Sequence, residues 1–112
     1  MEERILEKQV VLSEQFKLHR REIYTYGLRV FGFFQAEKYE GYIRQSLSTL
    51  STYYKVYPEC RHLASKKRIY RNIILDAHLI IYRITDEQIE VLDIIHSASS
   101  IRQIKAAKSI KI

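Results

Sequence analysis

The stretch "HLIIYRITDEQIEVLDIIHSASS", residues 78–100, predicts the centre of the fold. Its two apolar, β-branched runs, 78–85 and 88–96, are typical of strands, and the acidic pair Asp86-Glu87 between them indicates a tight turn. A similar run, "RIYRNIIL" (68–75), precedes them and is separated from them by Asp76-Ala77. The three runs therefore predict an antiparallel meander. Neither turn contains glycine, so the sequence leaves the register open by one residue.

The segments on either side of the meander predict a strand and helices. "KQVVLS" (8–13) reads as a short strand that ends in Ser13, a good helix N-cap. Apolar or small residues then recur at helical spacing up to Gly32, which indicates a break, and again from 36 to 54, before Pro58. A short basic helix or tail follows Ser100. The expected order is β-α-α-β-β-β, an α+β domain covering 1–112, with a helical hairpin packed on an antiparallel sheet of about four strands.

Both faces of the predicted sheet are largely apolar. A two-residue turn at Asp86-Glu87 would place Arg83 opposite Glu90, and Ile81 opposite Leu92, on one face. The other face would carry Ile80, Tyr82, Ile84, Ile89, Val91 and Ile95. An antiparallel sheet with one face in water normally alternates apolar and polar residues. Because the helical hairpin covers only one face, we expect the C-terminal tail or a partner chain to cover the other.

The positive charge of the sequence is concentrated in two blocks. The chain has 112 residues and a formal net charge of +6. The segments 61–71, "RHLASKKRIYR", and 101–112, "IRQIKAAKSIKI", contain no acid. Such blocks favour a surface that binds an anionic partner, either a nucleic acid or an acidic protein.

Several functional classes are excluded by what the sequence lacks. Cys60 is the only cysteine, which excludes an internal disulfide and fits a reducing cytoplasm. The four histidines are scattered, so we expect no metal, and no phosphate-binding glycine loop, zinc-protease motif or nucleophile elbow indicates a cofactor or a common enzyme class. No apolar run is long enough to span a membrane, and "MEERILEKQV" does not resemble a secretion signal.

Three polar residues in or beside the strands are candidates for chemistry. Arg83 interrupts an apolar run, and a cross-strand pair with Glu90 is its favoured role. Arg71 has no acid opposite it, so binding of an oxyanion and a structural role both stay open. His96 closes the last strand. A histidine titrates near neutral pH and suits general acid–base catalysis, but it also suits the end of a strand.

The chain also resembles a known protein family. The segments "EIYTY" (22–26), "AEKYEGYI" (36–43), "YPECRHL" (57–63), "YRNIILDAHLIIYRI" (70–84) and "IEVLDIIH" (89–96) resemble, in order and spacing, the RelE/ParE superfamily of bacterial toxins. The resemblance covers residues 8–100. It rests most firmly on Pro58 followed by Arg61, on the strand hairpin, and on the histidine that closes the last strand.

The resemblance implies the toxin of a type II toxin–antitoxin system, of the kind associated with plasmid stabilisation. Such a toxin inhibits growth in the bacterial cytoplasm and is neutralised by a cognate acidic antitoxin, with which it can form a hetero-oligomer. An antitoxin that lies across the toxin would also account for the apolar sheet face and the basic blocks.

The superfamily implies two different activities. RelE-like members are ribosome-dependent endoribonucleases that cut mRNA, whereas ParE-like members bind and poison DNA gyrase without cleaving a nucleic acid. The RelE-like reading assigns catalysis to Arg61, Arg71 and His96, and contacts with phosphate or target to Lys66, Lys67, Arg68 and Arg83. Some ribonuclease members have a tyrosine beside the histidine, where this chain has Ser97. The "IYTY" and "LDIIH" segments favour the ParE-like activity. A third alternative is an inert family member that only binds antitoxin.

Overall fold

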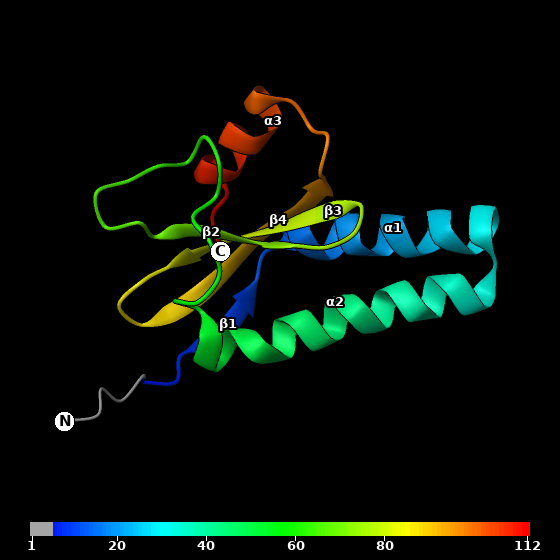
Figure 1. Ribbon diagram of the computed structural model, residues 1–112, viewed down its shortest axis with the longest axis horizontal. Helices are drawn as coiled ribbons and strands as arrows, with labels where there is room; N and C mark the ends of the chain where they lie inside the picture. The colour runs from blue at the N-terminus through cyan, green and yellow to red at the C-terminus, as the bar shows by residue number, and fades with distance from the viewer. Residues whose placement is uncertain (1–5) are drawn as a thin grey trace.

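The computed structural model describes residues 6–112, so the first part of the acidic N-terminal segment, residues 1–5, lies outside the described residues. The elements are β1 (Gln9–Leu12), α1 (Glu14–Phe31), α2 (Phe33–Tyr53), β2 (Tyr70–Ile74), β3 (His78–Ile84), β4 (Gln88–His96), α3 (Ile101–Ala106) and a 3₁₀ turn, η1 (Ala107–Ser109). This order confirms the predicted α+β class. The helical hairpin lies on one side of the sheet and projects well beyond it (Figure 1). Within residues 6–112, no helix has the length and apolar character needed to cross a membrane.

The sheet contains four strands in the order β1-β4-β3-β2. Strands β2, β3 and β4 form the predicted antiparallel meander. Strand β1 adds to the far edge of β4 in parallel, which makes the sheet mixed. A parallel neighbour needs a long crossover connection, and the helical hairpin between β1 and β2 is part of the chain that supplies it.

Two residues determine where the hairpin helices begin and end. The buried Ser13 hydroxyl accepts a hydrogen bond from the Phe16 backbone N–H at 2.9 Å and donates one to the Leu92 carbonyl at 2.6 Å, so it caps α1 and ties it to β4. Gly32 separates the helices with φ of 90°, in a region that side chains strongly disfavour. The break predicted at Gly32 is confirmed.

The β3–β4 register is correct near the turn and shifted beyond it. Arg83 pairs with Glu90, as predicted. Ile81 pairs with Asp93 rather than with Leu92, so that part of the prediction is wrong: a β-bulge inserts one extra residue into β4. Because side chains alternate along a strand, the extra residue places Ile94 in the core under the helices and Ile95 on the opposite face.

Each face of the sheet carries its own apolar core. The core under the helices includes Phe16, Ile43, Leu50, Tyr54, Ile73, Ile80, Tyr82, Ile89, Val91 and Ile94. The core on the opposite face includes Cys60, Leu63, Tyr70, Ile81, Leu92, Ile104 and Ala107. Of the two coverings expected for the second face, the C-terminal tail is therefore the one that packs there, together with the loop that precedes β2.

Candidate functional site

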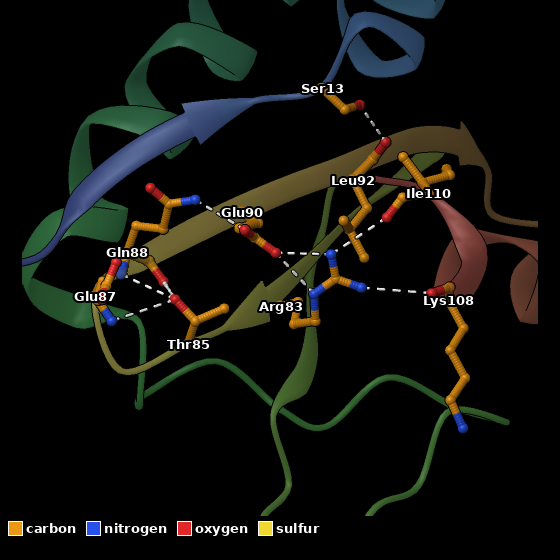
Figure 2. Close-up of polar contacts among 9 residues, drawn as sticks. All are labelled: Ser13, Arg83, Thr85, Glu87, Gln88, Glu90, Leu92, Lys108 and Ile110. Carbon is orange, nitrogen blue, oxygen red and sulfur yellow. Dashed lines mark hydrogen bonds and ion pairs between the residues drawn. The ribbon is translucent and has the colours of Figure 1, made fainter. Parts of the chain in front are cut away.

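Arg83 joins the sheet to the C-terminal tail. Its Nε and Nη2 atoms lie 2.8 and 2.7 Å from Glu90 Oε1, and the guanidinium also donates to the carbonyls of Lys108 (3.4 Å) and Ile110 (3.2 Å) (Figure 2). Burial opposes ionisation of Glu90, but hydrogen bonds from Gln88 and Arg83 outweigh it and lower the pKa of the carboxyl group. The predicted cross-strand pair is confirmed, and a direct contact between Arg83 and a target stays a prediction.

Arg71 binds backbone carbonyls in the loop that joins α2 to β2. Its Nη1 donates to the carbonyls of Lys55 (2.8 Å) and Tyr57 (2.9 Å), and its Nε donates to that of Arg68 (3.1 Å). Backbone carbonyls in such loop segments have no partner within a helix or strand, so the guanidinium satisfies acceptors that would otherwise lack a donor from the protein. This arrangement corresponds to the structural alternative for Arg71.

The loop of residues 58–69 presents the first basic block at the surface. The buried Cys60 and Leu63 anchor the loop to the tail-side core, whereas Arg61, Lys66, Lys67 and Arg68 are exposed. His62 and Arg68 have φ of 68° and 54°, a left-handed conformation that is uncommon outside glycine. Arg68 also pairs with Glu59 at 3.0 Å. Burial raises the pKa of Cys60 to about 11, which keeps the thiol protonated and unreactive at neutral pH.

His96 lies beside a second histidine that sequence reasoning missed. The His96 side chain is exposed, and its Nδ1 accepts a hydrogen bond from the Ala98 backbone N–H at 3.0 Å. The ring centroids of His96 and His78 are 5.7 Å apart, and His78 Nδ1 is hydrogen-bonded to the Tyr39 hydroxyl at 2.6 Å. The sequence placed both histidines at the same end of the meander, but their direct pairing depends on the bulge in β4, which the sequence does not indicate.

The histidine cluster borders a cavity of about 780 Å³ between the helical hairpin and the sheet. His19 also lines the cavity, and its Nδ1 is hydrogen-bonded to the buried Asp93 carboxylate at 2.6 Å. Burial raises the pKa of Asp93, although His19 and the Ile94 backbone N–H oppose this shift. Glu22 and Asp76 add further carboxylates to the lining. The histidines that line the cavity can donate or accept protons. The carboxylates beside them, however, repel a phosphate group.

The residues that the RelE-like hypothesis assigns to a ribonuclease site fall into two separate groups. Arg71 pairs with Tyr82 in β3, whereas His96 pairs with His78, four residues earlier in that strand. At the usual strand rise, these two positions are about 13 Å apart along the sheet. The other predicted contacts, Arg61, Lys66, Lys67 and Arg68, belong to the loop that leads into β2 beside Arg71. The structure therefore brings the basic residues together and leaves His96 apart from them.

The tip of the helical hairpin, residues 26–34, is an exposed apolar surface. Its large apolar side chains range from 39% exposed at Leu28 to 86% at Phe34, and they are Tyr26, Leu28, Val30, Phe31, Phe33 and Phe34. The apolar period that predicts α1 runs through Val30 and into Phe34, but the hairpin projects beyond the sheet at this point (Figure 1). An apolar cluster of this kind on a projecting element is typical of a protein-binding surface.

His78 gives the fold a dependence on pH. Burial lowers its pKa below the ordinary value of 6.5, and the charge of the facing His96 lowers it further; Tyr39 and Asp76 are its other titratable neighbours. The unfolded chain then binds the proton more readily, so the free energy of unfolding falls as the pH drops below about 6.5. We expect a lower midpoint in urea at about pH 5.5 than at about pH 7.5, and a smaller difference for His78→Gln. The variant His62→Gln, in the exposed loop, is the control, and an undiminished difference in His78→Gln would contradict the assignment.

A family model described as "ParE toxin of type II toxin-antitoxin system, parDE" matches residues 10–101. No curated protein sequence matches the chain. Nine chains of solved structures match. One of them, described as "Chromosomal ParDE TA system from P. aeruginosa", is 15% identical with a TM-score of 0.66, over 80% of this chain and 95% of that chain. At this identity the structural likeness shows the fold alone.

Proposed function

Since the chain belongs to the ParE toxin family of type II toxin–antitoxin systems, we propose that it arrests bacterial growth by binding DNA gyrase in the cytoplasm, without cleaving a nucleic acid. A cognate antitoxin neutralises it in a toxin–antitoxin complex. The net charge of +6 favours an acidic antitoxin, because opposite charges steer and strengthen such an association.

The separation of His96 from the arginines carries this proposal. Cleavage of RNA needs an acid or base and a phosphate-stabilising cation at the same phosphate, each within hydrogen-bond reach. Arg71 donates to three backbone carbonyls instead, and its position is about 13 Å from that of His96 along the strand direction, with β3 between the two strands. This placement supports a toxin that acts by binding.

The hairpin tip is the surface that we assign to gyrase. Aromatic residues contribute most of the energy of many protein interfaces, and Phe31, Phe33 and Phe34 are each more than half exposed here. The tip lies at the end of the molecule's longest dimension, away from the tail side of the sheet, so it can insert into a pocket of a much larger partner (Figure 1).

A ribosome-dependent ribonuclease is the second candidate function. The observation that favours it is the cluster of His78, His96 and Tyr39 beside the cavity, because these groups can exchange protons with a bound molecule. In that case Arg61, Lys66, Lys67 and Arg68 would bind the RNA backbone from the loop before β2.

Replacing His96 with alanine separates the two candidates. We expect induced His96→Ala to arrest growth as fully as the unmodified chain, with intact mRNA 5′ ends, a DNA-damage response, and undiminished inhibition of gyrase supercoiling by the purified variant. The reason is that His96 is exposed, and its ring accepts a hydrogen bond from the nearby Ala98 backbone N–H. Ser97→Ala, in the same turn, is the control for local disturbance. New cleavage sites in translated messages that disappear with His96→Ala would assign the ribonuclease activity instead, and harmless expression of the unmodified chain would contradict both candidates.

A further inference from the structure

The fold brings the two basic blocks of the sequence to one surface. Cys60 and Leu63, from the loop before β2, pack in the same core cluster as Ile104 and Ala107 from the tail. Lys108 also lies over the ring of Tyr70, with its Nζ 6.0 Å from the ring centroid. The exposed cations of the two segments therefore share the tail side of the sheet. They form what we call the basic surface: Arg61, Lys66, Lys67, Arg102, Lys105, Lys108 and Lys111.

The charge of the basic surface is not neutralised from within the chain. Among residues 6–112, none of these cations takes part in an ion pair. The two acids beside it are already paired, Glu59 with Arg68 and Glu90 with Arg83. Arg102, Lys105 and Lys108 follow one another at intervals of three residues along α3 and η1, so they form a stripe, while Ile104 and Ala107 point into the core. The free cations therefore favour a partner with a regular row of negative charges.

The side chains around these cations indicate which polyanion fits. Single-stranded nucleic acid is bound through bases that stack on exposed aromatic rings. The exposed aromatic residues of the described chain lie on α1 and α2, whereas Tyr70 and Tyr82 in the sheet are buried. Within the two basic segments, the exposed large apolar side chains are Ile101 and Ile112, so the surface also lacks the broad apolar centre typical of a protein interface.

We propose that the basic surface binds the phosphate backbone of duplex DNA without sequence preference. Lysine and arginine side chains that neutralise phosphates release counterions, which provides affinity independent of base sequence. This surface is distinct from the hairpin tip, so one molecule can contact DNA and a protein target together. The inference goes beyond gyrase binding and does not require it.

Fluorescence anisotropy with the isolated full chain and a short labelled duplex of mixed sequence tests the proposal. We expect binding that weakens steeply between about 50 and 200 mM salt. The variant K66A/K67A/R102A/K105A should bind more than about tenfold more weakly, and its slope of log affinity against log salt should fall by about one for each lost phosphate contact. The matched control is R21A/K38A/R44A/K55A, which removes the same charge from exposed positions on and just after the helices and should bind nearly as well.

Four results would overturn the assignment. They are no duplex binding at about 50 mM salt, equal losses in the two variants, tighter binding of a single strand of the same length, and binding of poly-glutamate as tight as that of the duplex. The last result would assign the surface to an acidic protein. Because the assay contains no gyrase, its outcome is separate from that of the gyrase proposal.

Discussion

Replacing Arg83 with alanine is expected to lower the free energy of unfolding by about 2–4 kcal/mol. The side chains of Arg83 and Glu90 are only 17% and 14% exposed, so the substitution leaves a carboxylate without its cation in a largely dehydrated position. It also removes the donors that hold the Lys108 and Ile110 carbonyls, which releases the tail from the sheet. Urea denaturation followed by circular dichroism measures the loss, and hydrogen exchange at the amides of Ile104 and Ile110 reports on the tail.

Two further variants test whether the loss comes from the unpaired carboxylate. The double variant Arg83→Ala/Glu90→Gln removes the buried negative charge and should regain part of the lost stability. Arg44→Ala removes an exposed arginine from α2 and should change the free energy of unfolding by less than about 0.5 kcal/mol. If Arg83→Ala proved as mild as Arg44→Ala, the link between sheet and tail would not depend on this arginine.

The second large effect is expected at the hairpin tip. The variant Phe31→Ser/Phe34→Ser should lose toxicity and inhibit gyrase supercoiling at least about 30-fold more weakly, as truncation of interface hot spots of about 2 kcal/mol or more implies. Because the two side chains are 63% and 86% exposed, the substitutions should leave the free energy of unfolding nearly unchanged. The measurements are growth after induction and the concentration that halves supercoiling.

The control for the tip lies at the opposite end of the hairpin. Tyr53 and Val56 are 54% and 67% exposed, and Tyr53→Ser/Val56→Ser should retain full potency. Equal losses in both variants would mean that the tip has no special role. A tip variant that inhibits gyrase normally but no longer co-purifies with antitoxin would assign the tip to the antitoxin instead.

The strands and helices were predictable because their patterns are local. The meander follows from apolar, β-branched runs separated by short acidic turns, and the hairpin follows from a helical period with a break at Gly32. The bulge at Leu92 was not predictable, because it depends on tertiary contacts. Asp93 sits at the bulge, and its carboxylate binds the Ile94 amide and His19, a residue far away in the sequence.

The site residues also divide into those with local partners, which the sequence predicts, and those with tertiary partners, which it does not. Arg83 pairs with Glu90 across one tight turn, and the sequence therefore predicted the pair. The partners of Arg71 are backbone carbonyls in the loop between α2 and β2. Any residue type supplies such carbonyls, so the sequence contained no signal for them. The exposure of the hairpin tip could not be predicted either. A helical period shows which face of a helix is apolar, but not where the sheet beneath that face ends.

The parallel pairing of β1 with β4 has a consequence for synthesis. Ser13 and Leu92, which are hydrogen-bonded to each other, are 79 residues apart in the sequence. Contacts between such distant residues slow folding, because a long loop must close before they form. The ribosome makes β4 after both helices. The helical hairpin therefore emerges before the strand whose side chains complete the core beneath it. The nascent fold therefore stays incomplete until β4 has been translated, and a toxin built in this way gains its sheet only after both helices have been made.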